Sequence, residues 1–144
     1  MLIIGAGEEG QLLGWRLRVQ ASDYHVVGYL DDDSSKQGLN IHGAKVLGTR
    51  QDVQALALKH QVDTIIVAID KIHGEEIQEI LGLCEKTTAK IKIAPDLFSF
   101  MEGPEGQPLV RDVSVEDLLA RESVPLDMEV CRKLLAGKVV LVTG

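Results

Sequence analysis

A short apolar run that ends in a glycine-rich turn is the feature that most constrains how this chain can fold. Leu2–Ile4 is followed at once by Gly5-Ala6-Gly7-Glu8-Glu9-Gly10 and then by a segment that favours a helix. A strand, a Gly-x-Gly-x-x-Gly turn and a helix are what a dinucleotide-binding site needs, in that order. Gly5 would allow the tight turn, Gly7 would let a pyrophosphate approach the backbone, and Gly10 would let the helix pack closely on the strand. The free N–H groups at the start of the helix would face the anion.

An acid at the end of the second strand, about 20 residues beyond the turn, is the second feature of such a unit. Residues 25–30 read as a strand, and Asp31-Asp32-Asp33 follows it directly. Asp31 therefore has the position of the residue that binds the ribose hydroxyls, and it would favour NAD over NADP because a carboxylate repels a 2′-phosphate. The predicted cofactor-binding residues are Gly5, Ala6, Gly7, Glu8, Glu9, Gly10, Asp31, Asp32, Ala68 and Ile69.

The same features also have a purely structural interpretation. Any α/β fold can have a tight first turn and a polar loop after its second strand. Glu8 and Glu9 are expected to be solvated acids of the first helical turn, where they favour the helix end but would also repel a phosphate.

Composition limits both the fold and the partners. The chain has 144 residues, of which 45% are hydrophobic and only 3% aromatic. The core must therefore consist of Val, Ile, Leu and Ala, as in α/β proteins with buried parallel strands. The net charge of −7 argues against nucleic acid as a partner. Cys84 and Cys131 are solitary, which fits a reducing compartment and neither a disulfide framework nor a zinc site. No signal peptide or membrane span is visible in these residues.

Further strands and helices alternate along the chain. A continuous apolar run at residues 64–69 is typical of a strand buried on both faces, whereas the charged and apolar alternation at 90–93 predicts a strand at the sheet margin. Helical spacing places Val19 on the apolar face of the first helix, and it makes Cys84 a small core residue of the third. We expect strands starting near Leu2, Val26, Val46, Thr64 and Ile91, and helices over about 8–20, 49–60 and 74–87.

The predicted fold class is α/β, a Rossmann-like doubly wound parallel sheet with a helical C-terminal connector. Residues 1–110 would form the nucleotide-binding domain, with an irregular loop at 98–108. Residues 111–137 would form the connector, beginning with a short helix that Ser114 and Asp117 cap. Residues 138–144 read as the first strand of a truncated second Rossmann domain, which would be catalytic and of the short-chain dehydrogenase type.

Six strings along the chain together resemble a known family. They are LIIGAGEEG, VVGYLDDDSSKQG, IHGAKVLGT, TIIVAI, VSVEDLLARESVPLD and GKVVLVTG. In this order they resemble the N-terminal cytoplasmic region of bacterial membrane-associated nucleotide-sugar 4,6-dehydratases and epimerases of polysaccharide biosynthesis. The resemblance covers nearly the whole chain, and its tail is the most specific part. The first two strings are shared more widely, including with sugar acyltransferases whose small Rossmann domain binds a nucleotide sugar.

The resemblance implies several properties of an intact protein. Transmembrane helices would precede this region and anchor the protein in the inner or plasma membrane, with this domain in the cytoplasm. The catalytic domain would hold NAD(P) and take a UDP-linked sugar. The N-terminal domain carries the label of a CoA-binding-like fold, a label that does not identify its ligand.

These residues contain no catalytic constellation. A short-chain dehydrogenase needs Tyr, or in some dehydratases Met, followed four residues later by Lys, which lowers the pKa of the phenol. Tyr24, Tyr29, Met101 and Met128 are followed at that spacing by Gly28, Asp33, Glu105 and Arg132. We therefore predict neither a catalytic residue nor a metal site, and we expect this chain alone to be inactive.

The leading hypothesis is thus a non-catalytic nucleotide-binding domain of a nucleotide-sugar dehydratase or epimerase. Its ligand would be NAD(H), with CoA or a UDP-sugar as alternatives, and its partners would be that ligand and the following catalytic domain. The alternative is a ligand-free module that links the membrane and catalytic parts and mediates homo-oligomerisation. A complete small oxidoreductase is the least favoured hypothesis.

Overall fold

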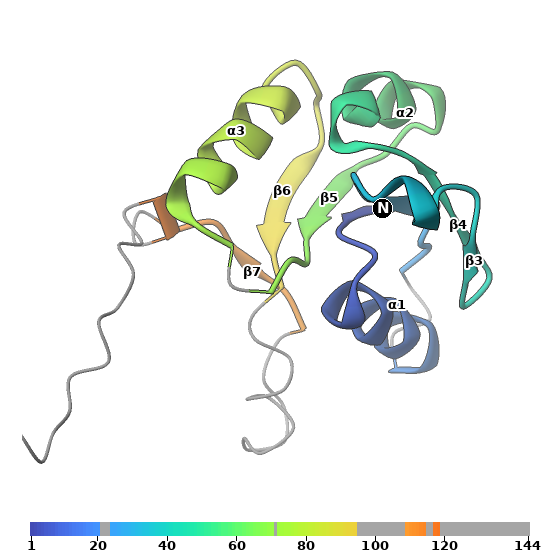
Figure 1. Ribbon diagram of the computed structural model, residues 1–144. Coiled ribbons are helices and arrows are strands. Elements are labelled where there is room, and N and C mark those ends of the chain that lie inside the picture. The colour runs from blue at the N-terminus through green and yellow to red at the C-terminus, as the bar shows by residue number, and fades with distance from the viewer. Residues whose placement is uncertain (21–23, 71, 95–108, 115–116, 119–144) are drawn as a thin grey trace, which may run out of the picture.

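The computed structural model describes residues 1–20, 24–70, 72–94, 109–114 and 117–118. They form one mixed sheet with helices on both faces (Figure 1). Its strands are β1 (Leu2–Ile4), β2 (Gly28–Leu30), β3 (Asn40–Ile41), β4 (Ala44–Gly48), β5 (Thr64–Val67), β6 (Lys90–Ile93) and β7 (Arg111–Asp112).

The middle of the sheet is parallel. The spatial order is β3-β4-β2-β1-β5-β6-β7, in which β4, β2, β1, β5 and β6 pair in parallel and the two edge strands pair antiparallel. From β1 the chain first adds strands on the β2 side and then crosses to β5 on the other side. This reversal is the topological switch point at which open α/β sheets bind ligands. The predicted α/β class and the five predicted parallel strands are confirmed.

Three α-helices cover the sheet. Helix α1 (Glu8–Gln20) lies on one face, and α2 (Val53–Lys59) and α3 (Gly74–Cys84) lie on the other (Figure 1). Two short 3₁₀ helices follow β2 and β4, namely η1 (Ser34–Lys36) and η2 (Arg50–Asp52). Among the described residues, no helix combines the length and the apolar character that crossing a membrane requires.

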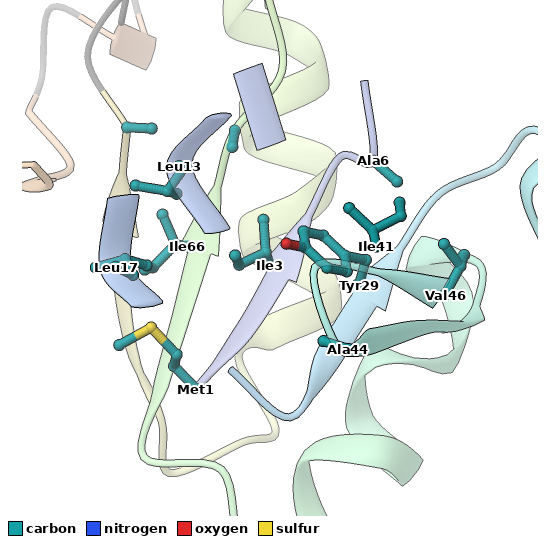
Figure 2. Packing of buried hydrophobic residues seen from close by; sticks show 12 residues of the cluster. Met1, Ile3, Ala6, Leu13, Leu17, Tyr29, Ile41, Ala44, Val46 and Ile66 are labelled. Atoms are coloured by element: carbon teal, nitrogen blue, oxygen red, sulfur yellow. The ribbon is translucent and has the colours of Figure 1, made fainter. Parts of the chain in front are cut away.

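Strand β1 supplies side chains to both halves of the core. Ile3 points to the α1 side and packs in a cluster with Leu17 and Tyr29 (Figure 2). Leu2 and Ile4 belong to the cluster on the α2 and α3 side. Successive side chains of a strand point to opposite faces, so a strand buried on both faces must be apolar throughout. This requirement explains the unbroken apolar runs in the sequence.

Helix α1 packs closely on the sheet because the helix residue opposite the Tyr29 side chain is a glycine, Gly14. A Cβ atom on Gly14 would lie 1.8 Å from the Tyr29 hydroxyl oxygen. Tyr29 is 1% exposed, and burial raises the pKa of its phenol above the ordinary value. It is thus a core residue.

Two predictions, one on a face of α1 and one on the place of β6, differ from the structure. Val19 was expected on the apolar face of α1 but is 62% exposed. Strand β6 is not the margin of the sheet, because β7 pairs with it on the outside. Cys84 is buried as predicted, and burial raises the pKa of its thiol to about 11, so it is protonated and inert at neutral pH.

The C-terminal predictions are only partly within the described residues. Arg111 and Asp112 were assigned to the connector but form β7. The Asp117 carboxylate accepts a 2.8 Å hydrogen bond from the backbone N–H of Ser114, as the predicted cap requires. The expected loop at 98–108, the remaining connector and the strand at 138–144 lie outside the described residues.

Candidate functional site

The three glycines of the turn after β1 are in different environments, and the fold does not require a glycine at each of them for the same reason. Gly5 has φ of +106°, and a Cβ atom there would lie 2.2 Å from the carbonyl oxygen of Ala68. A Cβ atom on Gly10 would lie 1.9 Å from the carbonyl oxygen of Gly5. At Gly7 a Cβ atom would meet no atom of the described residues within 4 Å. Packing therefore requires Gly5 and Gly10, whereas Gly7 borders open space.

That space belongs to a cavity of about 360 Å³ at the carboxyl ends of β1, β2 and β5. The structure brings most of the predicted residues to its wall, although they come from three separate parts of the chain. Those on the wall are Gly5, Gly7, Glu8, Glu9, Asp31, Asp32, Ala68 and Ile69. Ala6 and Gly10 are not among the lining residues, since Ala6 turns its N–H toward Asp31 and Gly10 packs on Gly5.

Asp31 connects the loop after β2 to the glycine turn. Its Oδ2 accepts hydrogen bonds from the Ala6 backbone N–H at 2.8 Å and from Lys36 Nζ at 3.0 Å. Its Oδ1 accepts one from the Asp33 N–H at 2.9 Å. Partial burial raises the pKa of Asp31, but these hydrogen bonds and the Lys36 charge outweigh it, so the pKa lies below the ordinary value. The carboxylate is therefore ionised at neutral pH.

Asp32 pairs with Arg50, whose guanidinium also contacts two glutamates of α3. The Asp32 Oδ1 accepts the Arg50 backbone N–H at 3.0 Å, and its Oδ2 pairs with the Arg50 Nε. The Arg50 Nη1 lies 3.0 Å from Glu76 Oε1 and 3.6 Å from Glu79 Oε2. One guanidinium thus holds three carboxylates and joins the end of β2 to the first turns of α3.

Asp33 has a third role and does not line the cavity. Its Oδ1 accepts hydrogen bonds from the backbone N–H of Ser35 at 2.9 Å and from the Ser35 hydroxyl at 2.6 Å, which caps η1. The three consecutive aspartates therefore hold the turn, pair with Arg50 and cap η1, respectively.

The sequence analysis did not predict several of the lining residues, and it did not predict that Glu9 is buried. Lys36, Arg50, Asp70 and Glu76 are far from the glycine turn along the chain, and only the sheet order and α3 bring them to the cavity. A polar residue just after β5, as Asp70 is, was the one signal available from the sequence. Glu9 was expected to be solvated, but it is 6% exposed although it lines the cavity. Glu8 is exposed as expected.

Among the described residues, no group of three or more His, Cys, Asp or Glu side chains is placed to hold a metal ion. The described part of the cavity wall consists of backbone, acids, two cations and aliphatic side chains. Such a wall can bind and orient a ligand, and its described residues include no phenol or imidazole.

Comparison with known proteins places this geometry in a family. The sequence model of a protein family described as a CoA-binding domain matches residues 1–95. The probable polysaccharide biosynthesis protein EpsC of Bacillus subtilis (strain 168) is 36% identical over 144 residues, which are 99% of this chain and 24% of that protein. The capsular polysaccharide biosynthesis protein CapD of Staphylococcus aureus is 33% identical over 145 residues, again 99% and 24%. The chain thus spans about a quarter of the length of either relative.

Solved structures show the same fold. UDP-D-quinovosamine 4-dehydrogenase from Vibrio fischeri has a TM-score of 0.69 and 27% identity, covering 83% of this chain and 96% of that one. The protein RSP in complex with β-NADH has a TM-score of 0.58 and 20% identity, covering 93% of this chain and 58% of that one. At 20% identity, the similarity to RSP shows a shared fold alone.

Proposed function

The chain belongs to the CoA-binding domain family, and from this premise we propose that it is a non-catalytic nucleotide-binding domain of a longer polysaccharide-biosynthesis protein. The observation that carries the proposal is the open space at Gly7. Packing explains the other two glycines of the turn, but none of the residues that the structure describes occupies the place of a Gly7 side chain. The approach of a ligand phosphate to the backbone would explain it.

The surroundings of Gly7 support this interpretation. The cavity lies at the carboxyl ends of β1, β2 and β5, where the strand order reverses. Helix α1 begins at Glu8, so its first N–H groups have no acceptor within the helix. Those groups and the helix dipole favour an anion at this place.

Three ligand classes follow from the relatives. The family description suggests CoA, the RSP complex suggests NAD(H), and the substrate in the name of the Vibrio fischeri protein suggests a UDP-sugar. Each contains a diphosphate that could lie against the glycine turn. NAD(H) remains our first choice from the Asp31 position, with CoA and a UDP-sugar as alternatives.

A thermal-shift panel tests whether a nucleotide binds. NAD, NADP, CoA, ATP and UDP-N-acetylglucosamine would each be added to this chain and to its Gly7→Val variant. A ligand at about 100 times its dissociation constant should add about 2.7 kcal/mol of stability to the wild type. The variant should unfold like the wild type without ligand but respond less. Equal responses of both proteins would place the ligand elsewhere.

We further propose that the intact protein is a membrane-anchored nucleotide-sugar 4,6-dehydratase or epimerase with this domain in the cytoplasm. This chain should not convert UDP-N-acetylglucosamine in the presence of NAD, because sugar dehydration needs a positioned acid and base beside a nicotinamide. An assay of the 4-keto product would compare it with a chain extended through the following domain. Turnover by the 144-residue chain would contradict the assignment.

One observation favours the alternative of a structural module. Trp15 and Val19, four residues apart on α1, are 45% and 62% exposed. Residues at this spacing share a helix face, so they form a small apolar surface that could contact another copy of the chain. Sedimentation of the wild type and of Trp15→Ser would test it: a shift from dimer to monomer, together with no response in the ligand panel, would favour this module.

A further inference from the structure

We propose that the cavity excludes coenzyme A itself, and that the charge of its wall restricts it to nucleotides with a diphosphate and no further phosphate group. The inference rests on the proposed function, because it names the ligand class of the same cavity. It also departs from the family description, which names coenzyme A.

The first observation is the imbalance of charge on the wall. Among the described residues, two cations line the cavity, Lys36 and Arg50. Five carboxylates that are exposed or half-buried line the same described part of the wall, namely Glu8, Asp31, Asp32, Asp70 and Glu76. The formal charges of these seven side chains, two positive and five negative, sum to −3.

The second observation is that carboxylates already hold both cations. Lys36 Nζ lies 3.0 Å from Asp31, and Arg50 pairs with Asp32, Glu76 and Glu79. If either cation turned to a ligand phosphate, its carboxylate partners would lose their counter-charge. The net formal charge of the described lining residues would stay negative in either arrangement.

The third observation concerns where favourable potential remains. The start of α1 beside Gly7 provides roughly half a positive charge. The neighbouring N–H of Ala6 is used by Asp31. This place suits one diphosphate. A ribose placed as in a Rossmann site would lie against Asp31 and Asp32, so a phosphate on its 2′ or 3′ oxygen would meet two paired carboxylates.

Coenzyme A carries a 3′-phosphate on its ribose in addition to its diphosphate, whereas dephospho-coenzyme A lacks only that group. NADPH and NADH differ by a 2′-phosphate, and UTP and UDP differ by one terminal phosphate. These three pairs isolate the effect of one phosphate while the base and the sugar stay the same.

The test is calorimetric titration of the chain with the three pairs at about 50 mM and about 500 mM NaCl. We expect dephospho-coenzyme A, NADH and UDP, where they bind, to bind at least about tenfold more tightly than their partners at low salt. High salt shortens the Debye length to a few ångströms and should reduce the ratio to about threefold or less. Asp70→Asn should lower the ratio at low salt, and Asp63→Asn, an exposed acid before β5, should not.

The outcomes separate the two proposals. Equal affinity within every pair that binds, or a ratio that salt does not change, would overturn the charge selection while the proposed function stands. If no member of any pair binds at about millimolar concentration, the proposed function fails and this inference fails with it.

Discussion

The carboxylate of Asp31 accepts a 2.8 Å hydrogen bond from the backbone N–H of Ala6, 25 residues away in the chain. This contact joins the end of β2 to the glycine turn after β1. It also gives Asp31 a structural role before any ligand is present. The same side chain thus shapes the cavity, and in the proposed function its remaining lone pairs would accept from a ribose hydroxyl.

Replacing Asp31 should therefore destabilise the protein. Hydrogen bonds to a charged group contribute about 1.5–3 kcal/mol each, and the Asp31 side chain is 13% exposed. We expect Asp31→Ala to lower the free energy of unfolding in urea by about 2 kcal/mol. Asp31→Asn keeps an acceptor for the Ala6 N–H and should lose less. Equal stability of Asp31→Ala and wild type would mean that the turn holds its shape alone.

Asp31 should also set the preference between the two nicotinamide dinucleotides if one of them binds. Its carboxylate can accept from a ribose 2′-hydroxyl and repels a 2′-phosphate, although Lys36 at 3.0 Å reduces that repulsion. We expect Asp31→Ala to bind NADH and NADPH with similar affinities, and Lys36→Met to discriminate more strongly than wild type. Fluorescence titration of the nicotinamide measures both. Unchanged discrimination in Asp31→Ala would make Asp31 a loop residue only.

The first two glycines of the turn should respond differently to the same change. Gly5→Ala places a Cβ atom 2.2 Å from the Ala68 carbonyl oxygen at a φ of +106°, so we expect a loss of several kcal/mol or failure to fold. Gly7→Ala meets nothing within 4 Å and should leave stability within about 0.5 kcal/mol. Chemical unfolding of the two variants gives the comparison. A Gly7→Ala protein as unstable as Gly5→Ala would show that packing requires both glycines.

The Asp117 carboxylate should titrate well below its usual range. Hydrogen bonds from Arg111 at 2.6 and 2.7 Å outweigh the effect of partial burial and lower its pKa from 3.8 to about 2. A depressed folded-state pKa stabilises the protein above about pH 4, and this contribution is lost as pH falls toward 2. NMR titration should find the low pKa in wild type and a higher one in Arg111→Ala. An identical pKa in both would rule out the ion pair as its cause.

Two glycines of α3 provide a matched pair for the contact with the C-terminal segment. A Cβ atom on Gly74 would lie 2.6 Å from the Leu118 carbonyl oxygen, whereas one on Gly82 would meet nothing within 4 Å. Gly82→Ala should stabilise the protein by up to about 1 kcal/mol through helix propensity alone. Gly74→Ala should not be stabilised in this way, because its Cβ atom would displace Leu118. We expect faster hydrogen exchange at Val113 and Ser114 in this variant. Equal stabilisation by both would show that Leu118 does not pack on α3.

Local sequence was sufficient to predict the elements near the glycine turn. The bounds of α1 agree with the prediction because a glycine turn followed by leucines at helical spacing, Leu13 and Leu17, specifies a helix locally. Strands β1 and β5 could be predicted because strands buried on both faces must be apolar throughout. By contrast, β7 has two exposed residues and no apolar pattern, so only its pairing with β6 identifies it as a strand.

The sequence by itself determined the turn, the acid after β2 and the absence of a Tyr-Lys or Met-Lys pair, since each depends on neighbours along the chain. Only the tertiary structure decided which charges meet. The order of the strands brings Arg50 against Asp32, Glu76 and Glu79, and it brings Lys36 to Asp31. The burial of Glu9 also depends on tertiary structure, because the packing of α1 on the sheet encloses this side of its first turn. Charge contacts between distant segments depend on sheet order and helix placement, and no local pattern encodes them.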